Sequence, residues 1–200
     1  MEQNIITSRQ NPIVKDVCGL AEKKKREASG LFRFDGFKLF GEAVDASMTL
    51  ERVIYREDVS ERAGALINEA IAKGCCARSA AVCVSGAVFE KISEERAPEG
   101  VICVARMPHE LHKTYTGKEC ELEGKRLLLA QSLRDPGNLG TVMRSCFALG
   151  IDRLILTSDC ADIYNSKTVR AAMGAIFKLD TTFVAPEELT GVIKTLKSSG

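Results

Sequence analysis

The sequence contains no tryptophan, two histidines and five prolines in 200 residues. Long hydrophobic runs are also missing, and the longest ones are far too short to cross a bilayer. The stretch from Asn4 to Lys15 is polar, which argues against a secretory signal peptide at the start. We therefore expect neither a membrane protein nor a secreted one.

Net charge is almost absent, because 28 lysines and arginines face 27 aspartates and glutamates, which leaves +1. Such a chain has no global field that attracts nucleic acid, so any affinity for RNA has to come from local patches. The eight cysteines form no C-x-x-C pair, which argues against a zinc ribbon. Several cysteines lie in apolar settings, where the reduced residue behaves as a small hydrophobe, and a cytoplasmic location fits this usage best.

Two further kinds of site find little support in the sequence. His109 and His112 have a spacing that could place both on one helical face, as a metal pair needs, but no third ligand is evident. We therefore predict a solvated linker around them. No G-x-G-x-x-G follows a strand-like run, which excludes a dinucleotide-binding Rossmann enzyme.

The most informative stretch runs from Lys125 to Thr157. Leu127 to Ala130 is a continuous apolar run, typical of a strand buried on both faces. The turn D-P-G-N follows, and Asn138 is a good N-cap for a helix that Gly150 ends. The apolar face expected for this helix consists of Leu139, Val142, Met143, Cys146, Phe147 and Leu149. A second strand begins at Leu154, so the stretch predicts a βαβ unit with parallel strands.

In parallel sheets, ligands bind beyond the carboxyl ends of the strands, which is where this turn would lie. The start of a helix offers free backbone N–H groups that stabilise an anion or a polarised oxygen. Arg144 is the one cation on the helix, and its place beside Thr141 in the helical projection puts it within reach of the turn. The alternative is a routine capped helix with a solvated arginine, since helix-start sites occur in many folds.

Strands and helices alternate elsewhere in the chain, which predicts an α/β layer structure. Asn11 and Pro12 suit the N-cap and first position of a helix. That helix is expected to end in a run of four cations: Lys23, Lys24, Lys25 and Arg26. The run is either a solvated helix end that suits the helix dipole or a set of phosphate contacts. Lys167 and Arg170, on a later predicted helix, leave the same two readings open.

Apolar periodicity is lost between Met107 and Gly124, a segment with one proline, two glycines and mixed charge. These features are typical of a linker. We therefore predict a first domain over residues 1–106, a linker over 107–124 and a second domain over 125–200.

The motif D-P-G-N-L-G-T-V-M-R-S-C-F-A-L-G-I resembles the first signature of the SpoU (TrmH) family, RNA ribose 2′-O-methyltransferases of the SPOUT superfamily. The family pattern is an Asn, a small residue two positions later and an Arg six positions after the Asn, which Asn138, Gly140 and Arg144 match. N-S-K-T-V-R-A-A-M-G-A-I-F resembles the family segment that follows. I-T-S-R-Q-N-P-I-V-K, F-D-G-F-K-L-F-G-E-A and V-F-E-K-I-S resemble parts of the family's substrate-binding domain.

The resemblance implies an α/β protein with a ribosomal-protein-like RNA-binding domain and the first part of a SPOUT (α/β knot) parallel-sheet domain. It implies S-adenosylmethionine as cofactor, rRNA or tRNA as partner, and a homodimer for full-length members. Asn138 and Arg144 would be the catalytic residues. Arg144 would clamp phosphate and position ribose rather than act as a base, because a guanidinium stays protonated. The cationic run of the first domain, with Lys167 and Arg170, would contact RNA.

One part of the family pattern is missing. Members continue with a glycine-rich loop containing Asn-Glu-Gly and then a Ser-Leu-Asn-Val segment, which bind the cofactor and close the trefoil knot. Neither occurs here, so the resemblance implies that the cofactor-binding residues lie beyond Gly200. We therefore expect the 200-residue chain to be truncated and inactive by itself. The alternative function is a non-catalytic RNA-binding module.

Overall fold

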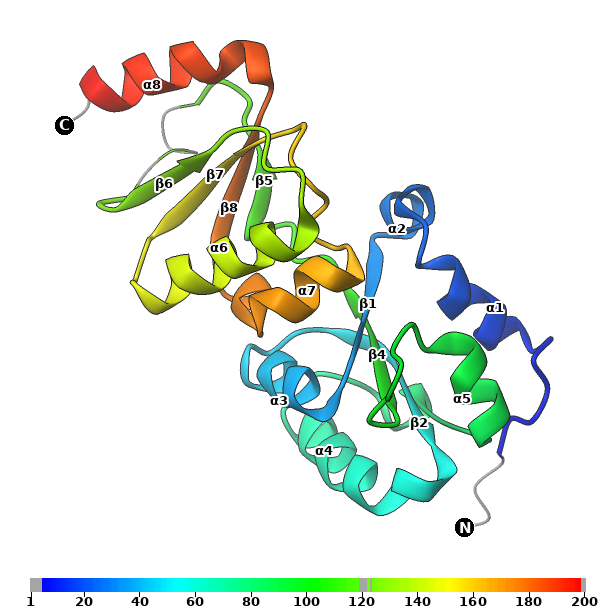
Figure 1. Cartoon of the computed structure of the whole chain (residues 1–200). Coiled ribbons are helices and arrows are strands. Elements are labelled where there is room, and N and C mark those ends of the chain that lie inside the picture. Colours follow the sequence, from blue (N-terminus) through cyan, green and yellow to red (C-terminus); the bar gives the residue numbers. More distant parts are fainter. Residues whose placement is uncertain (1–4, 119–121, 123, 199–200) are drawn as a thin grey trace. The chain divides into compact units, whose positions relative to one another are not determined.

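The computed structural model describes residues 5–118, 122 and 124–198, and the chain divides into two compact units, Met1–Met107 and Pro108–Gly200 (Figure 1). In the first unit, helices cover both faces of a four-stranded sheet of order β1-β4-β2-β3. Its strands are β1 (Leu31–Asp35), β2 (Leu50–Arg56), β3 (Ala81–Val84) and β4 (Val101–Arg106). Its helices are α1 (Pro12–Gly19), α2 (Lys23–Ser29), α3 (Phe37–Asp45), α4 (Ser60–Ala72) and α5 (Gly86–Ile92), with short 3-10 turns at Glu57–Val59 and Arg78–Ala80.

The sheet of the first unit is mixed. Strand β4 runs antiparallel to both β1 and β2, whereas β2 and β3 are parallel. Because successive strand residues point to opposite faces, Ile102 and Val104 of β4 belong to one apolar core with residues of α1 and α5. Figure 1 shows α3 and α4 together on the other side of this sheet. The first unit is therefore the α/β layer structure that the alternation of elements predicts.

The cationic run of the first unit does not end one long helix. Asn11 caps α1 as expected, its side chain accepting from Ile13 N–H at 2.9 Å, but the helix stops at Gly19 and a second helix begins at Lys23. Arg26 is buried, and its guanidinium donates to the carbonyl oxygens of Leu20 (2.8 Å) and Ala21 (2.7 Å). The side chain thus satisfies carbonyl groups that a continuing helix would have satisfied through its own backbone.

The second unit is built on a wholly parallel four-stranded sheet of order β5-β8-β7-β6. Its strands are β5 (His112–Thr114), β6 (Leu127–Ala130), β7 (Arg153–Thr157) and β8 (Asp180–Val184). Its helices are α6 (Pro136–Ala148), α7 (Ser166–Ala172) and α8 (Leu189–Ser198), with 3-10 turns at Ala175–Phe177 and Pro186–Glu188. Helices α6 and α7 lie on one side of the sheet and α8 on the other (Figure 1). The predicted βαβ unit is therefore β6-α6-β7.

Two expectations about burial in this βαβ unit are wrong. Strand β6 is half-buried along its whole length, because it is the last strand in the order and has a neighbour on one side only among the described residues. Phe147 and Leu149 are exposed by 47% and 70%, although both were expected to be buried. They lie in and just after the last turn of α6, beyond the buried Leu139, Met143 and Cys146. Apolar spacing alone thus overestimates how far the buried face of α6 extends.

The segment expected to be a linker contributes a strand to the second sheet. Residues His112, Lys113 and Thr114 pair in parallel with Thr181, Thr182 and Phe183 of β8. His112 is buried rather than solvated, and its Nδ1 lies 2.5 Å from the hydroxyl of Tyr164. Burial, reinforced by the nearby His109, lowers the pKa of His112 from 6.5 to about 4. The strand was missed because three residues are too few to show a period of two.

Helices α6 and α7 approach each other most closely at Gly140. A Cβ atom placed on Gly140 would lie 2.3 Å from the carbonyl oxygen of Thr168 and 2.6 Å from the Cβ of Ala171. These distances leave no room for any side chain, and a backbone oxygen cannot move aside as a flexible side chain can. The small residue of the Asn-x-small pattern is therefore a packing requirement of this helix pair.

Replacement of Gly140 by alanine should destabilise the second unit. Overpacking of a well-packed contact costs about 1–3 kcal/mol, and we expect the upper end because backbone atoms have to separate. Urea unfolding followed by circular dichroism measures the change. Gly191→Ala in α8 is the matched control, because nothing lies within 4 Å of its added Cβ and helix propensity favours alanine by about 1 kcal/mol. Equal stability of the two variants would contradict the proposed close contact.

Stability of the second unit should also depend on His112 in mild acid. The pKa is depressed in the folded state, so the unfolded state takes up a proton first as the pH falls below 6.5, and folding weakens until the pH reaches about 4. A shift of this size corresponds to about 3 kcal/mol, reached gradually between those pH values. Unfolding free energies measured from pH 7 to 4 should show this loss in the parent and in His109→Gln, but not in His112→Gln.

Candidate active site

Two loops meet at the carboxyl ends of β6 and β7. Ser132 has a positive φ of 52°, and its N–H donates to Thr157 Oγ1 at 2.9 Å. The hydroxyls of Ser132 and Thr157 both donate to the carboxylate of Asp159, each at 2.6 Å. Ala161 N–H donates to the carbonyl oxygen of Leu133 at 2.8 Å. The loop that leads into α6 is therefore held in place by the loop that follows β7.

Asp159 is the charged centre of this cluster. Hydrogen bonds from Ser132 and Thr157 hold the pKa of its carboxyl below 3.8, and the nearby Arg134 guanidinium acts in the same direction. Arg134 is exposed, with a nitrogen 3.7 Å from the Asp159 carboxylate. Asp159 thus remains ionised at neutral pH and holds its partners as an acceptor.

The start of α6 is capped by Asp135 and not, as the sequence analysis expected, by Asn138. The Asp135 carboxylate accepts from Asn138 N–H at 2.7 Å, and Pro136 occupies the first helical position. Pro136 has no N–H, and the N–H of Asn138 is bound to Asp135. Among the first three helical positions, the N–H of Gly137 is therefore the one without an acceptor in the described part of the chain. The carboxylate also adds negative charge at this helix end. The turn is therefore a poor anion site by itself, and side chains have to supply the recognition.

Those side chains lie on one face of α6. Asn138, Thr141 and Arg144 follow a spacing of three residues and are all exposed. Arg144 is about 9 Å along the helix axis from Asn138, but helical side chains lean toward the N-terminus, so a long side chain at this position can reach back toward the turn. Among the described residues, no hydrogen bond or ion pair was found for the Arg144 side chain. Asn138 and Arg144 are therefore both available to a ligand at the carboxyl edge of the sheet.

Helix α7 lies beside the first turns of α6 through the contact at Gly140 (Figure 1). Asn165 caps it, its side chain accepting from Lys167 N–H at 3.0 Å. Lys167 is exposed, whereas Arg170 is half-buried and already has a partner. Of the two predicted RNA-binding residues on α7, Lys167 is therefore the better placed to meet a ligand.

Comparison with known proteins gives two family matches that follow the division of the chain. Residues 11–103 match the MRM3-like substrate binding domain, and residues 125–200 match the SpoU rRNA Methylase family. The second unit is a SpoU methylase domain, and the first is an MRM3-like substrate-binding domain.

Two curated proteins illustrate the relationship. The 23S rRNA (guanosine(2553)-2'-O)-methyltransferase RlmP of Bacillus subtilis is 28% identical over 195 residues, which are 98% of this chain and 70% of that protein. The human mitochondrial rRNA methyltransferase 3 is 37% identical over 94 residues, which are 46% of this chain and 22% of that protein. The chain thus spans only part of the length of these relatives.

Among solved structures, the AdoMet-bound rRNA methyltransferase of Sinorhizobium meliloti resembles this chain with a TM-score of 0.74 and 27% identity. The alignment covers 97% of this chain and 69% of that one. The predicted fold class, a parallel-sheet SPOUT domain preceded by a second α/β domain, is therefore confirmed.

The cationic run in the substrate-binding half of this protein is divided by the fold. Arg26 is buried against α1, so it is not on the surface that RNA would meet, and its predicted RNA contact is not supported. Lys23, Lys24 and Lys25 are exposed, and Lys23 forms a 3.7 Å ion pair with Glu27 one helical turn away. Three of the four predicted cations therefore remain available for phosphate contacts.

Sequence reasoning missed the residues that shape the SpoU site. Ser132, Arg134 and Asp159 were not singled out, although each follows the end of a strand that leads to the carboxyl edge of the sheet. Polar residues directly after parallel strands are the signal that could have found them. The residues of each hydrogen-bonded pair, however, lie about 25 positions apart in the chain, so no local pattern indicates which residues are partners.

The described residues contain no group of three metal-ligating side chains. No helix in the described ranges is long and apolar enough to cross a membrane. The seven cysteines that the structure describes are all free thiols.

Asp159→Asn should loosen the site loops and reduce the stability of the SpoU domain at neutral pH. The Asp159 pKa is depressed in the folded state, so its stabilisation is complete above pH 3.8 and is lost as the pH falls through the lower folded value. The difference between parent and variant should therefore be largest near pH 7 and shrink toward pH 3. Urea unfolding at several pH values measures it, with Glu110→Gln as an exposed-carboxylate control. A difference that does not change with pH would rule out the ionised acceptor.

Proposed function

We propose that this protein methylates the 2′-hydroxyl of a ribose in RNA, with S-adenosylmethionine as the methyl donor. The proposal is supported above all by the exposed α6 face at the carboxyl edge of the parallel sheet, where the side chains of Asn138 and Arg144 have no partner among the described residues. The names of the relatives, rRNA 2'-O-methyltransferases among them, point the same way. S-adenosylmethionine is the ligand named for the Sinorhizobium structure.

Methyl transfer would break the bond between the methyl carbon and the sulfonium sulfur, which would leave as a neutral thioether, and would form a bond to ribose O2′, whose proton would pass to solvent. A displacement of this kind needs the acceptor oxygen in line with the leaving sulfur, so positioning is the main task of the protein. S-adenosylmethionine supplies the activated methyl group when it is bound. The polar groups of Ser132, Thr157 and Asp159 satisfy one another, so we assign none of them to the cofactor.

Arg144 is assigned to the phosphate next to the target ribose. Its planar guanidinium can form two parallel hydrogen bonds to phosphate oxygens, which fixes the orientation of the sugar. It does not serve as a simple base, because it stays protonated. Asn138, on the same face and nearly two turns closer to the loop cluster, offers an amide that can donate to and accept from the RNA or the loop backbone.

The first unit is proposed to hold the RNA substrate. This is supported by the match to a substrate-binding domain and by the exposed Lys23, Lys24 and Lys25 on α2. Lys167 would add a cation beside the active face of the second unit. A homodimer is also proposed, since the half-exposed β6 and the exposed Phe147 and Leu149 offer apolar surface. The free thiols support the cytoplasm as the site of action.

Arg144→Ala should lower the rate of RNA methylation about a hundredfold without changing the melting temperature. The rate loss follows from the misplaced sugar, and the exposed position explains the unchanged fold. The assay uses the protein expressed from its own gene, tritiated S-adenosylmethionine, and rRNA and tRNA from cells that lack the gene. Incorporated tritium measures the rate, and limited alkaline hydrolysis locates the resistant 2′-O-methylated linkage.

Two further variants make this test specific. Lys194→Ala removes an exposed cation from α8, on the opposite side of the sheet, and should methylate at the parent rate. Arg144→Lys keeps the charge but loses the planar fork, so it should remain well below the parent. An Arg144→Ala protein that methylates at the parent rate would remove Arg144 from the reaction. RNA binding without any tritium incorporation by the parent would favour the alternative, a non-catalytic RNA-binding module.

A further inference from the structure

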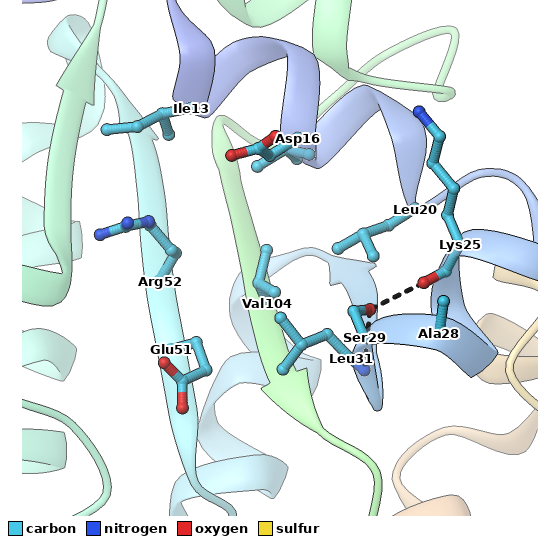
Figure 2. A pocket seen from close by; sticks show the side chains of 11 residues that line it. Ile13, Asp16, Leu20, Lys25, Ala28, Ser29, Leu31, Glu51, Arg52 and Val104 are labelled. Carbon is cyan, nitrogen blue, oxygen red and sulfur yellow. Dashed lines mark hydrogen bonds between the residues drawn. The ribbon is translucent and has the colours of Figure 1, made fainter.

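The first unit contains a pocket of about 490 Å³ at one end of its sheet (Figure 2). Helix α1 contributes Ile13 and Asp16, Leu20 follows it directly, helix α2 contributes Lys25 and Ala28, and strands β1, β2 and β4 form the remaining wall and floor. The volume lies within the range of roughly 300 to 1,000 Å³ that is typical of small-molecule sites. The break between α1 and α2, which Arg26 stabilises, allows the two helices to border the same hollow from different directions.

A β-bulge in β2 turns two neighbouring side chains toward this pocket. Leu50 pairs with Ala105 and Arg52 with Val104, so Glu51 is an extra residue opposite a single step of β4. In a regular strand Glu51 and Arg52 would point to opposite faces, but both line the pocket. Bulges of this kind often lie next to functional sites, where they redirect a side chain.

The lining combines three kinds of group. Leu20, Leu31 and Val104 form an apolar floor that can cover a flat ring. Lys25 and Arg52 provide two exposed cations, and Asp16 and Glu51 provide two carboxylates that accept hydrogen bonds. Glu51 is oriented by a 2.6 Å ion pair with Arg106. A ligand that matches this lining has a planar apolar surface, hydrogen-bond donors on its edge and a negative charge.

We propose that this pocket binds one unstacked nucleotide of the RNA substrate. The base lies against Leu20, Leu31 and Val104, and its exocyclic amino group donates to Asp16 or Glu51. The charged ends of Lys25 and Arg52 lie on opposite sides of the pocket (Figure 2), so each contacts a different phosphate of the strand. Recognition of splayed-out bases in this way is common for single-stranded RNA. The carboxylates favour guanine, adenine and cytosine, which carry an amino group, over uracil, which has none.

A nucleotide within a strand fits better than a free nucleotide. The exposed Lys23 and Lys24 continue the cationic surface along α2 beyond the pocket, where the phosphates on either side of the bound nucleotide would pass. The nucleotide ligand depends on the proposed function only because it is taken to be part of the substrate RNA. The contacts within the pocket do not depend on methyl transfer.

The test measures the binding of fluorescein-labelled 12-mers of adenosine, cytidine and uridine to the whole protein by fluorescence anisotropy, with the unlinked nucleoside monophosphates as competitors. Ala28→Phe fills the pocket from α2 and should weaken binding of the adenosine 12-mer at least tenfold. Ala87→Phe adds the same ring to an exposed position on α5 and should not change it. The uridine 12-mer should bind more weakly than the other two.

The double variant Lys25→Gln/Arg52→Gln keeps the pocket open and tests the phosphate contacts. Two lost contacts to a single strand should lower the slope of log K against log salt by about 1.4. An unchanged salt slope would contradict the proposed nucleotide site. So would an Ala28→Phe protein with the parent's melting temperature and the parent's affinity for the adenosine 12-mer. A monophosphate that competes as strongly as the 12-mer would overturn the assignment to a nucleotide within RNA.

The same variant separates this inference from the proposed reaction. If Ala28→Phe weakens 12-mer binding while the parent shows no methylation, the pocket stands and the reaction fails. If the parent methylates RNA and Ala28→Phe leaves KM unchanged, the reaction stands and the pocket fails.

Discussion

The close contact at Gly140 is the constraint on which the arrangement of the second unit depends. With the Thr168 carbonyl oxygen 2.3 Å from where a Cβ would be, α6 and α7 touch through their backbones. This contact fixes the position of α6 on the sheet and turns Asn138, Thr141 and Arg144 outward. The signature residues are thus coupled: the small residue sets the helix pair, and the helix pair presents the other two.

Most polar side chains near the site already bond to other protein groups and stabilise the structure. They differ in this from the side chains that are available to a substrate. Ser132, Thr157 and Asp159 form hydrogen bonds with one another, Asp135 caps α6, and Arg26 donates to the two carbonyl groups that follow α1. Each of these groups would have to give up an existing partner before it could bind a ligand. Arg144 has no such partner among the described residues, which is why a cation on an otherwise ordinary helix is the stronger candidate.

Features that depend on residues close together in the sequence were predicted correctly, whereas features that depend on distant partners were not. The βαβ unit, the cap at Asn11 and the α/β class follow from local patterns, and the structure confirms them. The edge position of β6, the strand at His112 and the burial of Arg26 depend on partners distant in sequence, so the local pattern misjudged them. Asn138 and Arg144 were predicted as site residues by resemblance to a signature, and that role stays a prediction, whereas the loop cluster around Asp159 has no contiguous motif that could indicate it.

The capped start of α6 also affects where a nearly neutral protein can obtain affinity for RNA. The Asp135 carboxylate accepts the Asn138 N–H and opposes an approaching phosphate, so the active face offers mainly the charge of Arg144. One contact contributes little of the salt-dependent affinity that phosphate binding provides. The remaining affinity has to come from local groups elsewhere, and α2 presents Lys23, Lys24 and Lys25 next to a pocket lined by Arg52. On this view the first unit supplies affinity and choice of nucleotide, while the second unit keeps few charges and uses them to orient the ribose.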